Sequence, residues 1–149
     1  MYGRRGRRAP YHCRVAAQRI LLADDDRRLI LLVRTFLGAE GYEVDTATDG
    51  VSAVEQALGG GHALVILDIM MPGIDGLEAC RRIRSHPATA DTPILIFSAL
   101  REEGESARLA GADAMLKKPF SLPTLAETVR RLAALPGGGA AAAPGSQSA

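Results

Sequence analysis

The stretch that decides the fold is residues 63–76, Ala-Leu-Val-Ile-Leu-Asp-Ile-Met-Met-Pro-Gly-Ile-Asp-Gly. An apolar run ends at the carboxylate of Asp68, and a loop that contains Pro72, Gly73 and Gly76 follows it. A short apolar run before turn-forming residues is typical of a strand that is buried on both faces of a parallel sheet. Because burying an unpaired carboxylate is costly, we expect Asp68 at the carboxyl edge of that sheet, where open α/β folds bind ligands.

The chain on either side of this run alternates between strand-like and helix-like patterns. Strands are predicted at 19–23, 42–47, 63–67, 93–97 and 114–116, and helices at 27–37, 51–58, 77–85, 101–110 and 121–135. Asp26, Asp49 and Ser121 are expected to cap helices, and Arg81, Arg82 and Arg84 to form an outward, solvated face. Alternating strands and helices are typical of right-handed β-α-β crossovers. The sequence therefore predicts an α/β fold, a doubly wound parallel sheet of five strands with helices on both faces.

The charges divide the chain into three parts. Residues 1–19 hold six of the 18 basic residues and no acid, which leaves 12 basic and 17 acidic residues in the remainder, a balance of 12 − 17 = −5. We expect residues 1–18 to be a basic flexible arm, 19–135 one folded domain, and 136–149 a disordered Gly/Ala/Pro tail. No output domain is expected in the chain.

Composition also bears on the cellular compartment. Cys13 and Cys80 match no metal or redox spacing, which favours a reduced setting. No apolar run is long enough to span a bilayer, and no secretory segment precedes the domain. A cytoplasmic location without membrane contact is the expectation.

Polar residues follow the predicted strands where the strands end. They are Asp24, Asp25, Asp26, Asp68, Ser98 and Lys118. Parallel strands all end at one edge of a sheet, so these side chains are expected to converge. Each has a plainer explanation when taken alone: an aspartate after a strand is usually a cap or turn former, and a lysine before proline is usually solvated. Their joint placement is what favours a site.

Crowded carboxylates raise one another's pKa unless a cation lies between them. Mg²⁺ prefers oxygen ligands and commonly binds one or two carboxylates together with phosphate oxygens. With Mg²⁺ present, Asp68 is expected to act as a nucleophile toward a phosphoryl group. Lys118 would pair with the phosphoryl oxygens, and Ser98 would donate a hydrogen bond to one of them.

Four motifs make a family resemblance plain. They are Ile-Leu-Leu-Ala-Asp-Asp-Asp (20–26), Leu-Asp-Ile-Met-Met-Pro-Gly-Ile-Asp-Gly (67–76), Ile-Phe-Ser-Ala (96–99) and Gly-Ala-Asp-Ala-Met-Leu-Lys-Lys-Pro-Phe (111–120). Over roughly residues 18–135 the chain resembles the receiver domain of two-component response regulators, in the manner of the single-domain chemotaxis regulators. The resemblance implies the flavodoxin-like strand order 2-1-3-4-5.

The resemblance also implies a role for each site residue. Asp68 matches the phosphoacceptor, and Asp24 and Asp25 match the acidic pair, with Asp25 as a direct Mg²⁺ ligand. The backbone carbonyl of Met70 would complete the metal contacts. Ser98 matches the switch hydroxyl, and Lys118 the family's lysine, whose bond to the next residue, Pro119, would be a cis peptide.

Two departures from the family pattern concern the switch. Met115 stands where the family has an aromatic ring that moves together with the hydroxyl. The segment between Ser98 and Lys118 is also shorter than the family's, and the loss falls near Gly104. The shortened segment belongs to the fourth helix, on the face that many relatives use for dimerisation or partner docking, so that surface is not carried over from the family.

The expected function is that of a single-domain response regulator. A sensor histidine kinase or a histidine phosphotransfer protein would donate the phosphoryl group, and an output protein would bind the face formed by the last two strands and helices. A homodimer stays open. The chain is not expected to be an enzyme beyond its own phosphorylation and dephosphorylation.

Three alternatives remain open at this stage. One is a receiver-like interaction module that never takes phosphate. Another is a Mg²⁺-dependent phosphatase of the haloacid dehalogenase type, although Met70 stands where that family has a second aspartate. Nucleic-acid binding would involve only the Arg-rich arm.

Overall fold

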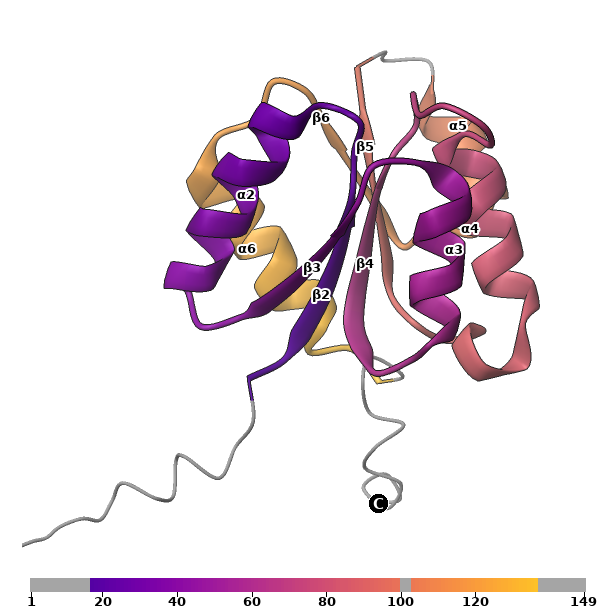
Figure 1. Ribbon diagram of the computed structural model, residues 1–149, viewed down its shortest axis with the longest axis horizontal. Helices are drawn as coiled ribbons and strands as arrows, with labels where there is room; N and C mark the ends of the chain where they lie inside the picture. Colours follow the sequence, from indigo (N-terminus) through magenta and orange to yellow (C-terminus); the bar gives the residue numbers. More distant parts are fainter. Residues whose placement is uncertain (1–16, 100–102, 137–149) are drawn as a thin grey trace, which may run out of the picture.

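The computed structural model describes residues 17–99 and 103–136. The predicted arm and tail, and the start of the helix predicted at 101–110, therefore lie wholly or mostly outside the described residues. The elements in chain order are β2 (Arg19–Ala23), α2 (Arg27–Ala39), β3 (Glu43–Ala47), α3 (Gly50–Leu58), β4 (His62–Asp68), α4 (Gly76–Ser85), the 3-10 turn η1 (Pro87–Thr89), β5 (Ile94–Ser98), α5 (Glu103–Leu109), β6 (Ala114–Lys117) and α6 (Leu122–Ala133) (Figure 1).

The strands form one five-stranded sheet in the order β3-β2-β4-β5-β6. Every adjacent pair is parallel. Counted from the first strand, this is the order 2-1-3-4-5, so the predicted fold is confirmed. Figure 1 shows α2 and α6 over one face of the sheet and α3, α4 and α5 over the other.

The sheet separates two apolar clusters, and β4 supplies both. Leu64 and Ile66 pack with the residues of α2 and α6, whereas Val65 and Leu67 pack with those of α3, α4 and α5. Successive side chains of a strand point to opposite faces, which explains the division. All seven residues of β4 are buried, so the strand that ends in Asp68 lies in the centre of the molecule.

Side-chain caps fix where the helices begin. Asp26 accepts hydrogen bonds from the backbone of Arg28 and Leu29, and Asp49 accepts one from Ser52. Ser121 accepts one from Thr124. These three caps confirm the predicted ones, and they satisfy backbone N–H groups that have no partner within the helix.

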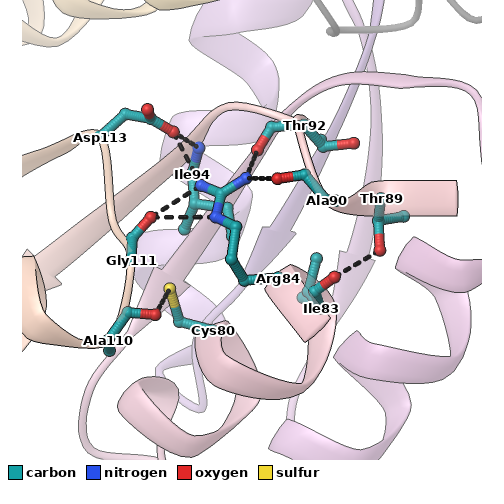
Figure 2. A network of polar contacts seen from close by, with 10 residues as sticks. All are labelled: Cys80, Ile83, Arg84, Thr89, Ala90, Thr92, Ile94, Ala110, Gly111 and Asp113. Atoms are coloured by element: carbon teal, nitrogen blue, oxygen red, sulfur yellow. Dashed lines mark hydrogen bonds and ion pairs between the residues drawn. The ribbon is translucent and has the colours of Figure 1, made fainter. Parts of the chain in front are cut away.

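Arg84 differs from its expected place on a solvated helix face. All five of its N–H donors are used: Nε and Nη2 bond Gly111 O, Nη1 bonds Ala90 O and Thr92 O, and Nη2 also bonds Asp113 (Figure 2). Asp113 in turn accepts the backbone N–H of Ile94. The side chain therefore ties α4 to the loops that precede β5 and β6.

Candidate functional site

Three carboxylates meet at the carboxyl edge of the sheet. Asp24 follows β2, Asp25 is next to it, and Asp68 is the last residue of β4. Each offers an oxygen atom, and these atoms all lie within 4.8 Å of one another. Asp24 and Asp68 are buried, with 0% and 5% of their surface exposed, whereas Asp25 is exposed. The parallel register of β2 with β4 produces this convergence, as the sequence predicts.

Lys118 reaches the same point from the end of β6. Its Nζ lies 3.0 Å from Asp24 Oδ2 and 3.0 Å from Asp68 Oδ1. Its backbone N–H donates to Ser98 O over 2.6 Å, and the Lys118–Pro119 peptide is cis. One ammonium group is thus shared between two buried carboxylates that belong to different strands.

The electrostatic consequence is clearest at Asp68. Burial raises the pKa of the Asp68 carboxyl to about 6. The hydrogen bond from Lys118 lowers this pKa and the negative charge of Asp24 raises it, but burial has the largest effect. For Lys118, burial works against the ammonium, but the hydrogen bonds to Asp24 and Asp68 raise its pKa above the usual value. The ammonium is well stabilised and Asp68 remains short of positive charge, because one cation cannot neutralise two carboxylates.

Ser98 ends the strand beside Asp68. In the register of β4 with β5, Asp68 lies opposite Phe97, so Ser98 is one residue further along the same edge. Ser98 is fully buried, and its Oγ donates a hydrogen bond to the carboxylate of Glu103 at the start of α5. The sequence gives no sign of this partner, because the contact depends on where α5 begins.

The loop after Asp68 is held by a close backbone approach. The N–H of Gly76 donates to Ile69 O over 2.9 Å, and a Cβ atom on Gly76 would stand 2.2 Å from Asp68 O. Gly73 has a φ of 80°, a conformation that favours glycine. Met70 is 66% exposed in this loop, two residues beyond Asp68.

The structure thus brings together most of the predicted site residues: Asp24, Asp25, Asp68, Ser98 and Lys118 all lie at one edge. Asp26 is not part of this cluster, because its carboxylate caps the N-terminus of α2. The donor set fits Mg²⁺, which prefers oxygen ligands and seldom has a cage made only of protein atoms. Asp24, Asp25 and Asp68 are the residues that could hold the ion, and the shortage of positive charge at Asp68 is what a divalent cation would relieve.

Comparisons with known proteins agree with this geometry. The family model for the response regulator receiver domain matches residues 20–130. The chain is 40% identical over 116 residues to the phosphate regulon transcriptional regulatory protein PhoB of Rhizobium meliloti (strain 1021), covering 76% of this chain and 51% of that protein. The chain spans about half the length of the curated relatives it matches.

Solved structures give the same result. The chemotaxis response regulator CheY4 of Vibrio cholerae superposes with a TM-score of 0.74 at 31% identity, over 78% of this chain and 98% of that one. The response regulator TrrA of Thermotoga maritima, solved in complex with Mg²⁺-BeF, has a TM-score of 0.71 at 38% identity, over 77% and 98% of the two chains. Among the described residues, no helix is long and apolar enough to cross a membrane.

Proposed function

We propose that this chain, which belongs to the family of response regulator receiver domains, accepts a phosphoryl group on Asp68 and thereby changes which protein it binds. The observation that carries the proposal is the ammonium of Lys118, 3.0 Å from both Asp24 and Asp68 inside an acidic cluster. Phosphoryl transfer needs positive charge placed around an acceptor oxygen, and Lys118 places an ammonium group beside Asp68.

We assign the chain's own groups as follows. A carboxylate oxygen of Asp68 forms the bond to phosphorus while the bond from phosphorus to the donor's imidazole nitrogen breaks. Lys118 pairs with the transferred oxygens, and Ser98 donates a hydrogen bond to one of them. Mg²⁺ would be held by Asp24, Asp25, Asp68 and the backbone carbonyl of Met70. The ion would supply positive charge that neutralises the negative charge developing on the phosphoryl oxygens.

The proposed donor is the phosphohistidine of a sensor histidine kinase or of a histidine phosphotransfer protein in the cytoplasm. An apolar groove of about 260 Å³ is lined by Leu29 and Leu32 of α2, by Phe120, and by Asp26 and Lys118. A donor helix that covered this groove would bring its histidine to the acidic edge. The groove therefore supports a protein donor, since apolar surface beside a reactive group favours a docked partner.

For the readout we propose the action of a single-domain regulator on a separate output protein. The face that carries it comprises β5, β6, α5 and α6, where Leu109 is 73% exposed. Self-association through the same face is a further proposal. No other catalysis is proposed, beyond the chain's own phosphorylation and dephosphorylation.

The proposal is tested with a small-molecule phosphodonor, acetyl phosphate. The intact mass should rise by one phosphoryl group with Mg²⁺ present and stay unchanged in EDTA. Asp68→Asn should abolish the gain, whereas Asp26→Asn should keep it, because asparagine also caps helices well. Labelling of Asp68→Asn to the level of the natural chain would overturn the assignment.

The same material separates the alternatives. A receiver-like module that never takes phosphate would show no gain in mass with Mg²⁺ and acetyl phosphate. A phosphatase of the haloacid dehalogenase type would turn over a phosphomonoester such as p-nitrophenyl phosphate many times per chain. We expect a single phosphorylation and no such turnover, because Met70 offers no side-chain acid for a leaving group.

A further inference from the structure

Ser98 already has a carboxylate partner before any phosphoryl group arrives. Its Oγ donates a hydrogen bond to Glu103, the first residue of α5. A serine hydroxyl carries one proton and can donate to one acceptor at a time. We propose, building on the proposed function, that Glu103 competes with the phosphoryl group for the Ser98 proton and so restrains phosphorylation of Asp68.

Charge acts in the same direction as this competition. An aspartyl phosphate adds a multiply charged group with strong acceptor oxygens, at an edge that already holds Asp24 and Asp25. When Ser98 turns its proton toward that group, the Glu103 carboxylate loses the hydrogen bond from Ser98 and faces a new negative charge nearby. Both effects push Glu103, and the first turn of α5 with it, away from Ser98.

Gly104, the residue after Glu103, transmits this movement to Met115, which stands where the family has its aromatic ring. A Cβ atom on Gly104 would lie 3.3 Å from Met115 Cε, so the first turn of α5 packs directly on Met115. Met115 lies opposite Ile96 in the register of β5 with β6. Two consecutive residues of α5 thus contact the hydroxyl and the methionine that replaces the family's ring.

α5 is also the helix that can shift at least cost. Within the part of the chain that the structure describes, α5 runs over seven residues and buries only Ala107, whereas α6 on the opposite face buries six. Elements with few buried contacts open and move most readily. In this chain, therefore, phosphorylation is read out by release of Glu103 and movement of α5 over Met115, and no ring movement is needed.

The test measures how tightly the chain binds beryllofluoride, a phosphoryl mimic, with Mg²⁺ in excess. Fluorine NMR gives the dissociation constant for the natural chain, Glu103→Ala and Glu103→Gln. Glu103→Ala should bind about tenfold more tightly, because a hydrogen bond to a charged group is worth about 1.5 kcal/mol or more. Glu103→Gln keeps an acceptor and loses the charge, so its gain should be smaller.

Glu105→Ala is the matched control. Glu105 lies in the same first turn and pairs with Arg108 at the surface, so this variant removes one negative charge without touching Ser98. Its affinity should equal that of the natural chain. An unchanged or weaker affinity of Glu103→Ala, or an equal gain in Glu105→Ala, would overturn the proposal.

Two further measurements make the result specific. In a Ser98→Ala background, Glu103→Ala should tighten binding less, because the hydroxyl under competition is gone. Amide hydrogen exchange of residues 103–109 should be faster in Glu103→Ala, as it should be in the natural chain with Mg²⁺ and beryllofluoride. If even the natural chain does not bind beryllofluoride through Asp68, the proposed function itself fails; if it binds and the Glu103 variants match it, only the role of Glu103 fails.

Discussion

Lys118 is one cation that serves two buried carboxylates. Its Nζ lies at the same distance, 3.0 Å, from Asp24 and from Asp68. Burial of an acid without a full countercharge favours the protonated form, and burial accordingly raises the pKa of Asp68 to about 6. Without a metal ion, the ionised form of Asp68 is therefore disfavoured in the folded chain at neutral pH, and this cost can be measured.

The raised pKa of Asp68 predicts that the free energy of unfolding decreases as pH rises. The folded chain keeps the Asp68 proton up to a pKa of about 6, whereas an unfolded aspartate loses it near a pKa of about 3.9. Between these values the native state binds more protons than the unfolded state, so stability falls as pH rises and levels off above about pH 6. The loss is on the order of 2–3 kcal/mol, because each pKa unit corresponds to about 1.4 kcal/mol.

Urea denaturation from pH 4 to pH 8 in EDTA measures this effect. Asp68→Asn cannot titrate, so the difference in unfolding free energy between it and the natural chain isolates Asp68 from the other acids. We expect the variant to be the more stable protein above pH 6 and to lose that advantage toward pH 4. A difference that does not change with pH would contradict the prediction.

Not every residue-level contact could be predicted from the sequence. Asp24, Asp68 and Lys118 could be, because each follows a predicted strand and parallel strands end at the same edge of a sheet. Glu103 could not, because its contact with Ser98 depends on the position at which α5 starts. Arg84 was expected to be solvated on helical spacing alone, yet its partners Ala90, Thr92 and Gly111 come from loops that the fold brings to it.

At the scale of elements, α3 supports the loop that follows Asp68. A Cβ atom on Gly50, the first residue of α3, would stand 2.3 Å from Ile74 O and 2.4 Å from Ile74 Cγ1. Real Cβ atoms do not come so close, so α3 and the loop between β4 and α4 can meet only because residue 50 is glycine. The loop that follows Asp68 therefore rests on the first turn of a different helix.

This contact predicts that Gly50→Ala is damaging. The added methyl group must displace Ile74, and overpacking of this kind costs about 1–3 kcal/mol. Gly38→Ala in α2 is the matched control, because nothing lies within 4 Å of its Cβ position and alanine favours helices. We expect urea denaturation to show a loss of stability in Gly50→Ala and none in Gly38→Ala.

Phosphorylation separates a loop effect from a purely global one. At a temperature where both variants are fully folded, Gly50→Ala should take phosphate from acetyl phosphate more slowly, because the loop past Asp68 is displaced. Gly38→Ala should keep the natural rate. Equal stability and equal rates in the two variants would show that Ile74 gives way without consequence.

At the scale of the whole molecule, the sheet separates two apolar clusters, and the helices that cover them contribute unequal numbers of buried residues. α2 and α6 hold a cluster that includes Phe97, whose ring lies 4.7 Å from that of Phe120. The opposite cluster ends at α5, which contributes little buried surface. The acidic edge lies at the ends of strands that separate the two clusters, so a change of charge there acts on both sides of the sheet, and α5 is the helix with the fewest buried residues.

Mg²⁺ should stabilise the whole fold, because the carboxylates that would bind it are brought together only in the native state. At a Mg²⁺ concentration of 100 times the dissociation constant, linkage gives about 2.7 kcal/mol of added stability. Thermal or urea unfolding with increasing MgCl₂ measures the gain. NaCl at matched ionic strength controls for screening of the acidic cluster.

Two neighbouring aspartates make that prediction specific. Asp25 offers an oxygen to the cluster, whereas Asp26 accepts the backbone N–H groups of Arg28 and Leu29 as the cap of α2. Asp25→Asn should therefore lose most of the stabilisation by Mg²⁺, and Asp26→Asn should keep it, although both variants remove one negative charge from the same loop. An equal loss in the two variants would mean that the ion responds to the overall charge of this edge and not to a site built by Asp24, Asp25 and Asp68.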